Sequence, residues 1–422
     1  MYERGVTQRL LAALSDTPVV LLHGPRQAGK TTLAQHLASG AHPATYLTLD
    51  TPAVLAAAKG DPAGFVARLQ GPTVIDEIQR APELFMSIKE AVDRHRRPGR
   101  FLVTGSANVL LLPRLAEFLA GRMAVLTLHP LAQCEIEGRG GKMVDWLFAS
   151  APPSVATVAT TREDVVRRIV AGGYPEPLAR EPARRDEWFG AYVTTILSRD
   201  VRDIAQRIER LAELPRILAL LASRTGALLN VADIARTVGI PYTTLRSYLS
   251  VLQTTFLIHL IPAWTANVRH RLVKAPRLVT IDTGLAAYLG GADAARVASE
   301  PDLLGALLET FVITELLKQA GWSRTLPVAY HYRTDAGEEV DLVFEDRTGR
   351  VVGIEVKSAV SVGPGDFRGL RGLQRDAGKK FHRGVLFYLG ETTVPFGENL
   401  SAVPVGALWH DLNQETAARR KS

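Results

Sequence analysis

The stretch 18-PVVLLHGPRQAGKTTLAQHLA-38 decides the fold of the N-terminal part of the chain. An apolar run is followed by G24-P-R-Q-A-G-K-T31 and then by a segment with helical spacing. The pattern G-x-x-x-x-G-K-[ST] between a strand and a helix is typical of a phosphate-binding loop. Its backbone N–H groups and the N-terminus of the helix both point at the anion. The stretch therefore predicts a nucleotide site at the end of a buried strand.

The residues expected to hold the nucleotide are the loop itself and the first turn of the helix. Lys30 is expected to reach the β- and γ-phosphates, and the hydroxyl of Thr31 is expected to bind Mg²⁺. ATP and Mg²⁺ are therefore the predicted cofactors. The predicted contacts come from Gly24, Pro25, Arg26, Gln27, Ala28, Gly29, Lys30, Thr31 and Thr32.

Two acids end the apolar run 73-TVIDE-77. In a phosphate-binding protein of this kind, Asp76 is expected to hold the magnesium ion and Glu77 to orient or deprotonate the attacking water. A pair of solvated carboxylates at a strand end is the alternative interpretation. Taken with the preceding loop, the two acids predict ATP hydrolysis.

Further polar residues are candidates to sense the nucleotide or to complete its site. The run 101-FLVTGSAN-108 ends in small polar residues, so Asn108, or Ser106, is expected to hydrogen-bond the γ-phosphate or the lytic water. A polar turn is the alternative. Arg122 follows a glycine and precedes another apolar run, and it is a candidate arginine finger that reaches a neighbouring subunit. A surface arginine is the alternative.

The composition is typical of a multidomain globular protein. With 422 residues, 46% of them apolar, the chain can bury several cores. Apolar runs alternate with helical patterns from the start to about residue 130, which predicts a parallel α/β sheet. The single cysteine, Cys134, excludes an intrachain disulfide, and no apolar run approaches the roughly 18 residues of a spanning helix. We expect a cytoplasmic protein with no membrane segment.

Seven motifs occur in order along the chain: HGPRQAGKTTL, VIDEIQRAPELF, LVTGSAN, LAGRMAVLTLHPL, GGYPEPL, SRDVRDI and KAPRLVTIDTGLAAYL. Together they resemble a prokaryotic family of AAA-type ATPases, described as archaeal-ATPase-like, whose C-terminal region has no assigned function. The resemblance covers nearly the whole chain. It implies a P-loop fold and ATP binding, but no particular biological substrate. AAA-type ATPases commonly assemble so that an arginine of one subunit completes the next site, so we expect a homo-oligomer.

The segment 228-LLNVADIARTVGIPYTTLRSYLSVLQTTFLI-258 predicts a helix, a tight turn at Gly239 and a second helix. This is the layout of a helix-turn-helix, and its second helix is expected to enter the major groove of DNA. No Asp or Glu occurs between Ile234 and Ile281. The candidate DNA-binding residues are Arg246, Arg269, Arg271 and Lys274. A module that binds proteins, or packs on the ATPase, is the alternative.

The segment 338-EEVDLVFEDRTGRVVGIEVKSA-359 places charged residues in two apolar strands. Strand alternation puts Glu355 and Lys357 on one face of the second strand, and Asp341 and Val343 on one face of the first. An isolated buried charge costs several kcal/mol. The charged residues are therefore expected to be paired, hydrated in a cleft or bound to a metal ion.

This order of Asp and E-x-K resembles the core of PD-(D/E)XK nucleases of the restriction-endonuclease-like fold. The resemblance implies that Asp341 and Glu355 bind Mg²⁺ and that Lys357 stabilises developing charge. It also implies a third metal ligand on the preceding helix, with Glu309 as the first choice and Glu315 as the second. The chain departs from the pattern at Val340, where a proline is usual. A salt-bridged hairpin, or a nuclease fold without turnover, stays open.

The sequence therefore predicts an α/β fold with an AAA-type P-loop NTPase parallel sheet, a helical and winged-helix region, and an α/β restriction-endonuclease-like C-terminal domain. The predicted segments are the ATPase domain 1–150, a linker and helical region 151–215, a winged-helix-like domain 216–298 and a nuclease-like domain 299–410. The predicted function is ATP hydrolysis associated with DNA, with a metal-dependent nuclease-like domain. The alternative is a nucleotide-controlled switch or partner-binding protein whose nuclease-like domain is inert.

Overall fold

The computed structural model of the protein describes residues 1–108, 121–150, 160–201, 211–267, 271 and 274–410. The chain forms two compact units. The nucleotide unit comprises residues 3–130 and 250–257, and the C-terminal unit comprises residues 1–2, 131–249 and 258–422. Within the described ranges, no helix has the length and apolar character needed to cross a membrane.

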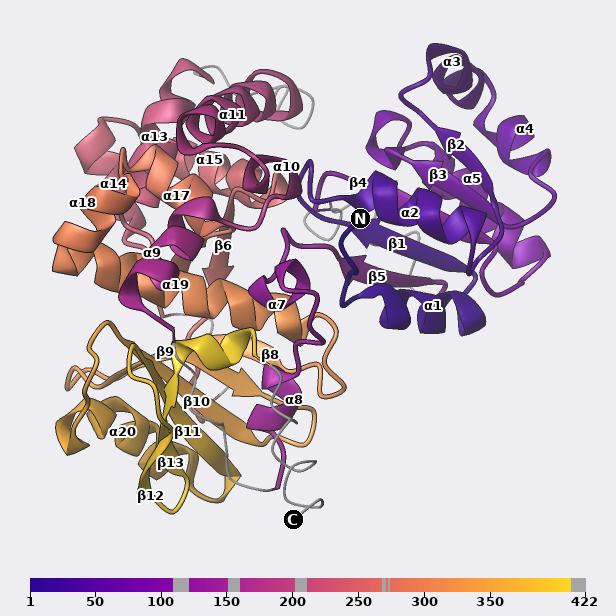
Figure 1. Ribbon diagram of the computed structural model, residues 1–422. Helices are drawn as coiled ribbons and strands as arrows, with labels where there is room; N and C mark the ends of the chain where they lie inside the picture. Colours follow the sequence, from indigo (N-terminus) through magenta and orange to yellow (C-terminus); the bar gives the residue numbers. More distant parts are fainter. Residues whose placement is uncertain (109–120, 151–159, 202–210, 268–270, 272–273, 411–422) are drawn as a thin grey trace. The chain divides into compact units, whose positions relative to one another are not determined.

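The nucleotide unit is built on a five-stranded parallel sheet of order β2-β3-β4-β1-β5 (Figure 1). Its strands are β1 (Val19–His23), β2 (Thr45–Thr48), β3 (Thr73–Asp76), β4 (Phe101–Gly105) and β5 (Met123–Thr127). Its helices are α1 (Thr7–Asp16), α2 (Lys30–Ser39), α3 (Pro52–Gly60), α4 (Pro62–Ala67), the 3₁₀ turn η1 (Ile78–Arg80) and α5 (Leu84–Arg94). The predicted parallel α/β sheet is confirmed.

Both faces of the strand β1, which lies between β4 and β5, are covered. Every residue of β1 is buried, and its side chains alternate between two hydrophobic clusters. Leu21 packs with Phe85 of α5, and Leu22 packs with Leu33 of α2 on the opposite face. A strand buried on both faces reads as a continuous apolar run, as VVLL does. Because the sheet is parallel, the carboxyl ends of β1, β3 and β4 meet at one edge, where ligands bind in such folds.

The first part of the C-terminal unit is mainly helical. It contains α7 (Gln133–Ile136), α8 (Met143–Leu147), α9 (Arg162–Ala171), α10 (Pro175–Leu178), α11 (Pro182–Thr195), the π-helical turn η4 (Ile196–Asp200), the 3₁₀ turn η5 (Leu211–Glu213), α13 (Leu214–Ala222), α14 (Val231–Val238), α15 (Tyr242–Thr254), α17 (Thr283–Leu289) and α18 (Ala294–Ser299). The last residues of α15, from Ser250, belong to the nucleotide unit.

The predicted pair of helices around Gly239 is present as α14 and α15. The side chain of Asn230 caps α14 by accepting the N–H of Asp233 at 3.0 Å, and Gly239 ends the helix in the left-handed conformation. The strands β6 (Ile258–Ile261) and β7 (Arg277–Thr280) follow as an antiparallel pair. Arg277 also forms a bridge with Leu228, which precedes α14.

The last part of the C-terminal unit is a six-stranded mixed sheet of order β12-β13-β11-β10-β9-β8. Its strands are β8 (Val328–Arg333), β9 (Glu339–Glu345), β10 (Val351–Lys357), β11 (Phe381–Tyr388), β12 (Val394–Gly397) and β13 (Leu400–Pro404). Its helices are α19 (Pro301–Ala320) and α20 (Arg368–Ala377), with the 3₁₀ turns η6 (Pro364–Phe367), η7 (Gly378–Lys380) and η8 (Val405–Leu408). In the middle of this sheet, β10 pairs with β11 in parallel and with β9 in antiparallel.

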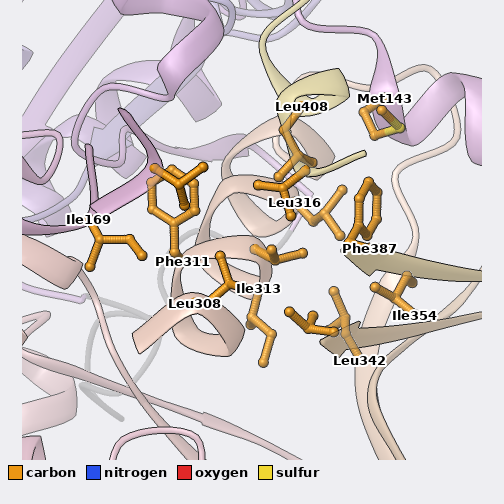
Figure 2. Packing of buried hydrophobic residues seen from close by; sticks show 14 of the residues in the cluster. Met143, Ile169, Leu308, Phe311, Ile313, Leu316, Leu342, Ile354, Phe387 and Leu408 are labelled. Atoms are coloured by element: carbon orange, nitrogen blue, oxygen red, sulfur yellow. The ribbon is translucent and has the colours of Figure 1, made fainter. Parts of the chain in front are cut away.

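Opposite faces of this sheet enter different hydrophobic clusters. Leu342 and Ile354 lie near Leu308 and Ile313 of α19 (Figure 2). On the other face, Val343 packs in a cluster that includes Leu370 and Leu373 of α20. Most of α19 is buried, which explains why it lacks a continuous polar face. The strand β10, which contains Glu355 and Lys357, is thus an inner strand with both faces covered.

The two compact units do not follow the four predicted segments. The structure groups residues 131–150 with the C-terminal unit, and residues 250–257 with the nucleotide unit. The N–H of Leu131 donates to the carbonyl of Gly173 at 2.7 Å, a tertiary contact that composition does not reveal. The four-part division therefore stays a prediction.

Candidate functional site

The loop between β1 and α2 follows a backbone path that requires glycine at its motif positions. Gly24 has φ of 152°, and a Cβ atom there would lie 2.1 Å from the carbonyl oxygen of Leu128. Gly29 caps α2 with a left-handed φ of 96°. Arg4 supports the loop from outside, since its Nη1 donates to the carbonyl of Ala28 at 2.7 Å. Larger side chains at the two glycines would displace the loop.

Lys30 is the first residue of α2 and is buried. Its Nζ donates to the carbonyl oxygens of Gly24 at 2.9 Å and Pro25 at 2.8 Å. The ammonium group is therefore held by the loop itself. Of the other predicted residues, Arg26, Gln27 and Ala28 lie in the loop before α2, and Thr32 lies in the first turn of α2.

Asp76, the last residue of β3, is the centre of a hydrogen-bond network. The hydroxyl of Thr31 donates to its two carboxylate oxygens at 3.2 and 3.1 Å. The hydroxyl of Tyr46 donates to Oδ2 at 2.8 Å, and the hydroxyl of Thr104 donates to Oδ1. Burial and the Asp76 carboxylate raise the pKa of Tyr46 above its usual value, so Tyr46 stays a donor. The two predicted magnesium ligands, Thr31 and Asp76, are thus adjacent.

Glu77 follows in a conformation that is uncommon outside glycine. Its φ and ψ are 61° and 43°, in the left-handed region, which costs about 1 kcal/mol or more for a non-glycine residue. Gln79 donates from Nε2 to the Glu77 carboxylate and, at 2.8 Å, to the hydroxyl of Ser106. The Ser106 hydroxyl also donates to Glu77 Oε2 at 3.4 Å. The side chains of Gln79 and Ser106 therefore orient Glu77. Gln79 was not among the residues predicted from the sequence.

The two residues proposed as sensor and finger have other contacts. The backbone N–H of Asn108 donates to the carbonyl of Thr254 at 2.8 Å. Arg122 directly precedes the edge strand β5, and its Nε lies 2.5 Å from Asp93 Oδ1, with both side chains partly exposed. Of the alternatives Asn108 and Ser106, the structure brings the Ser106 side chain to the catalytic candidate Glu77.

His23 was not predicted as part of this site, although it directly precedes Gly24. Its Nε2 lies 2.8 Å from the hydroxyl of Thr127, and its ring packs edge-on against Phe256 with centroids 5.2 Å apart. Burial, together with the positive charge of Lys30, lowers the pKa of His23 to about 4. The imidazole is therefore neutral at pH 7. The signal in the sequence for a buried histidine is its position at the end of the apolar run VVLL, directly before Gly24.

A second candidate site, which we call the carboxylate pocket, lies in the C-terminal unit. It is a hollow of about 430 Å³. Its walls include all the residues predicted for the metal site, from α19, β9 and β10: Glu309, Asp341, Glu355 and Lys357, together with Glu339, Asp366 and Arg368. These residues are dispersed in sequence, and the fold brings them together. Their proposed roles stay predictions.

The carboxylates of the pocket differ in their partners. Asp341 Oδ2 accepts the backbone N–H of Val356 at 2.8 Å. Glu355 Oε1 accepts Lys357 Nζ at 2.8 Å, whereas the buried Glu355 Oε2 has no hydrogen-bond partner among the described residues. Burial, and then the charge of Asp341, raises the pKa of Glu355 to about 8. Burial also raises the pKa of Asp341, while nearby Arg277 opposes that shift.

Arg277 is the residue of this pocket that sequence reasoning placed elsewhere. It lies in β7, its side chain is 5% exposed, and its Nη1 contacts Glu309 Oε1 directly. The same Nη1 lies 3.4 Å from Asp341 Oδ1, and Nη2 lies 3.9 Å from Glu339 Oε2. In the sequence, Arg277 belongs to the segment without Asp or Glu between Ile234 and Ile281, which also holds the candidate DNA-binding residues. The structure gives Arg277 a different environment, because its guanidinium is buried among carboxylates.

The donor set of the pocket suits a divalent cation in its chemistry. Carboxylate oxygens are the ligands that Mg²⁺ and Mn²⁺ prefer, and the unpartnered Glu355 Oε2 is a ready acceptor. In the ranges that the structure describes, however, no three His, Cys, Asp or Glu side chains form a preassembled metal-binding group. The Arg277 guanidinium lies between Glu309 and Asp341, two of the three predicted ligands.

Glu315, the second choice for a metal ligand, has a different environment. It is fully buried, pairs with Lys318 Nζ at 2.7 Å and accepts the N–H of Gln133 at 2.7 Å. It does not line the carboxylate pocket. Of the two glutamates, only Glu309 lies with Asp341 and Glu355.

The candidate DNA-binding residues have unlike surroundings. Arg246 is exposed on α15, and Lys274 is exposed beside Arg333, to whose carbonyl it donates at 3.0 Å. Arg271 is largely buried, because it pairs with Glu345 at 2.8 Å and stacks on aromatic rings. The structure thus gives Arg271 a packing role that the basic pattern did not show. Arg269 lies outside the described residues.

A second hollow, of about 410 Å³, lies next to the carboxylate pocket and shares Gly337 with it. Lys274 and Arg333 are among its lining residues. His331 also lines it, and burial lowers the pKa of His331 to about 4, with the charge of Arg277 adding to the effect. At neutral pH the two exposed cations therefore supply the positive charge of this hollow.

Comparisons with known proteins divide the chain into three matched regions. Residues 16–137 match an AAA domain. Residues 162–296 and 304–408 match two domains of unknown function, DUF8612 and DUF4143. The AAA match covers the loop, Asp76, Glu77 and Arg122. The chain is thus an AAA-domain protein, and AAA domains bind nucleotides, typically as Mg–ATP.

A solved structure and two full-length relatives are similar to the chain. The Thermotoga maritima RuvB Holliday junction branch migration motor is 20% identical over 62% of this chain and 90% of its own, with a TM-score of 0.31, too low to transfer its arrangement or function. The uncharacterized proteins Rv2008c of Mycobacterium tuberculosis and Mb2031c of Mycobacterium bovis are each 33% identical over 401 residues, 95% of this chain and 83% of theirs. The chain therefore belongs to the family of these mycobacterial proteins, with an AAA domain at its N-terminus followed by DUF8612 and DUF4143 regions.

Proposed function

We propose that the protein binds and hydrolyses ATP with Mg²⁺ at the loop between β1 and α2. The observation that carries this proposal is the hydrogen bond between Thr31 and Asp76, at 3.1 to 3.2 Å, across the carboxyl edge of the sheet. A hydroxyl and a carboxylate in contact beside a glycine loop form the oxygen ligands that a nucleotide-bound magnesium ion requires. The match to an AAA domain supports the same activity.

The residues of the site divide the work of hydrolysis. Bound Mg²⁺ supplies charge neutralisation at the phosphates, and Thr31 and Asp76 would hold it. Lys30 exchanges its hydrogen bonds to the Gly24 and Pro25 carbonyls for phosphate oxygens. Glu77 orients and deprotonates the lytic water, and Gln79 and Ser106 hold its carboxylate in place.

The substitution Glu77→Gln tests this assignment. It removes the base but keeps the hydrogen-bonding shape, so we expect phosphate release to fall about 100-fold or more while ATP binding remains. Turnover is measured by phosphate release, and binding by the fluorescence of a labelled ATP analogue. The control is Glu90→Gln, because Glu90 is exposed on α5. Undiminished turnover in Glu77→Gln would exclude Glu77 as the base.

For the assembled protein we propose that Arg122 acts across a subunit interface in a homo-oligomer. Its partly exposed guanidinium, paired with Asp93, supports this role, since it can exchange partners at a surface. Mixing Arg122→Ala subunits with Glu77→Gln subunits tests it. If the arginine acts in trans, mixed assemblies regain part of the turnover that each variant lacks. Mixtures as inactive as their components would contradict the proposal.

A second candidate function is metal-dependent hydrolysis of nucleic acid at the carboxylate pocket. The observation that favours it is the buried, unpartnered Glu355 Oε2 in a hollow shared with Asp341 and Lys357. Asp341 and Glu355 would hold the metal ion, with Glu309 as a third ligand, and Lys357 would face the phosphate. The neighbouring hollow, with Lys274 and Arg333, suits the adjacent phosphate of a polynucleotide.

Cleavage assays with Mg²⁺ or Mn²⁺ on several DNA forms test the second function. We expect Asp341→Ala and Lys357→Ala to abolish cleavage, while Glu391→Ala, in an exposed loop, leaves it unchanged. Cleavage that survives the first two substitutions would exclude this site. No cleavage by the wild type would favour the other possibility, a nucleotide-controlled switch whose C-terminal part only binds a partner.

A further inference from the structure

Arg277 reaches the carboxylate pocket from a part of the chain outside the strands that build it. It lies in β7, in the two-stranded sheet that follows α15, whereas the pocket carboxylates come from α19, β9 and β10. The side chain is only 5% exposed and contacts Glu309 and Asp341. The buried guanidinium therefore neutralises carboxylates that a cation from solvent would otherwise neutralise.

Several acceptor oxygens of the pocket already contact a hydrogen-bond donor. Asp341 Oδ2 accepts the Val356 N–H, and Glu355 Oε1 accepts Lys357 Nζ. Asp341 Oδ1 and Glu309 Oε1 face Arg277. Glu355 Oε2 is buried and has no hydrogen-bond partner within the described part of the chain. A metal ion that binds Glu355 Oε2 and extends to Asp341 or Glu309 must therefore meet the oxygens that Arg277 uses.

We propose that Arg277 is a tethered counter-cation of the carboxylate pocket, and that a divalent cation competes with it for Glu309 and Asp341. Two cations on the same oxygens repel each other, so each weakens the binding of the other. Metal binding is thereby linked to the position of β7, because Arg277 must withdraw for the ion to reach full coordination. The inference deepens the second proposed function, since it concerns the same carboxylates, but it predicts cation affinity and not cleavage.

A purely structural ion pair is the competing explanation. In that case Arg277 anchors β7 to α19, and its removal lowers stability without improving metal binding. The two explanations make opposite predictions for the affinity of the pocket once the guanidinium is removed. They also differ on whether added metal loosens β7 in the unaltered protein.

Titration calorimetry with Mn²⁺ on the full-length protein, without nucleotide, distinguishes the two. We expect Arg277→Gln to bind Mn²⁺ at least tenfold more tightly than the wild type, and Arg277→Lys, which keeps the charge, to stay within about threefold of it. The double variant Arg277→Gln/Asp341→Asn should lose the gain, which places the ion in this pocket and not at the nucleotide site. Equal or weaker affinity in Arg277→Gln, or a gain that survives Asp341→Asn, would overturn the proposal.

Hydrogen exchange on the unaltered protein provides a test that does not depend on the folding of a variant. Saturating Mn²⁺ should speed amide exchange in β7 at least severalfold, and Asp341→Asn should remove that response. Unchanged or slower exchange in β7 would overturn the proposal. Its failure is separable from failure of the second function, because DNA cleavage that requires Asp341 would stand even if Arg277 does not compete with the metal ion.

Discussion

The nucleotide site and the carboxylate pocket are built in contrasting ways. Most of the nucleotide site comes from one loop and the residues that end β3 and β4, and its side chains bond to one another. Lys30 is bound by the loop, and Asp76 accepts three hydroxyl groups. The pocket draws on α19, β9, β10, η6 and α20, and a buried oxygen, Glu355 Oε2, has no hydrogen-bond partner within the described residues. The side chains of the first site are therefore held by one another, whereas the second site leaves a buried carboxylate oxygen without a hydrogen-bond donor.

This contrast indicates where each site receives its cation. In the mechanism proposed for the nucleotide site, Lys30 would bind phosphate and a metal ion would arrive with the nucleotide. In the pocket the carboxylates already contact side-chain cations, Lys357 of β10 and, from another element, Arg277. Cation binding at the nucleotide site would therefore depend on the nucleotide. Cation binding at the pocket would depend on whether Arg277 leaves Glu309 and Asp341.

The substitution Lys30→Ala is expected to have the largest effect and tests the first half of the comparison. It removes the phosphate-directed ammonium and also the bonds to two loop carbonyls. We expect ATP turnover to fall about a thousandfold or more. Phosphate release measures this, with Lys59→Ala, exposed on α3, as the control. Wild-type turnover in Lys30→Ala would show that the loop is not the ATP site.

Two ion pairs on the single helix α19 allow a test of the second half. Glu315 and Lys318 form a pair in the core with side chains 0% and 5% exposed, so Lys318→Met leaves a carboxyl buried without its partner. We expect this to lower the free energy of unfolding by about 3 kcal/mol or more. Glu309 is 22% exposed at the pocket, and Glu309→Gln should cost less than about 1 kcal/mol, because Glu309 is partly hydrated and Arg277 keeps Asp341 as a partner.

Chemical denaturation of the two variants, followed by hydrogen exchange in α19, measures the difference. The comparison fails if Glu309→Gln is as destabilising as Lys318→Met. That result would mean that the pocket carboxylates are as well balanced by Arg277 as Glu315 is by Lys318.

The sequence predicted the two sites to different extents for a physical reason. The loop motif, TVIDE and the strand pattern are local, so the order of the elements was enough to place Lys30, Thr31 and Asp76 at one edge of a parallel sheet. Glu309 was also predicted, because the resemblance to PD-(D/E)XK nucleases implies a glutamate on the helix that precedes the hairpin, and it lines the pocket. Arg277 was missed, because it pairs with carboxylates 32 and more residues later, and charge counting along the chain cannot show burial. Gln79 was missed because its role depends on the unusual backbone of Glu77.

The pH dependence of stability tests the nucleotide unit separately from the pocket, because His23 belongs to the nucleotide unit. Its pKa is lowered from 6.5 to about 4 in the folded protein, so the unfolded state binds the proton more readily between these values. The stabilising contribution is complete above pH 6.5 and is lost as the pH falls through about 4, by about 3 kcal/mol in total. Hydrogen exchange in β1 between pH 7 and pH 4 measures it. His23→Gln should flatten this profile, whereas His36→Gln, exposed on α2, should not.

The smallest expected effect concerns the basic region between the two sites in sequence. Arg246 is exposed on α15, while Arg271 is held by Glu345 and two aromatic rings. If the region binds DNA through phosphates, Arg246→Ala should weaken binding a few-fold and reduce the salt slope of log K by about 0.9. Arg271→Ala should leave that slope unchanged and instead lower stability, since a partly buried ion pair and ring contacts are lost.

Fluorescence anisotropy with a short duplex between 50 and 200 mM salt measures both slopes. Equal slope changes in the two variants would mean that Arg271 leaves its buried partners to bind DNA, and that the distinction between exposed and packed arginines does not hold in this region.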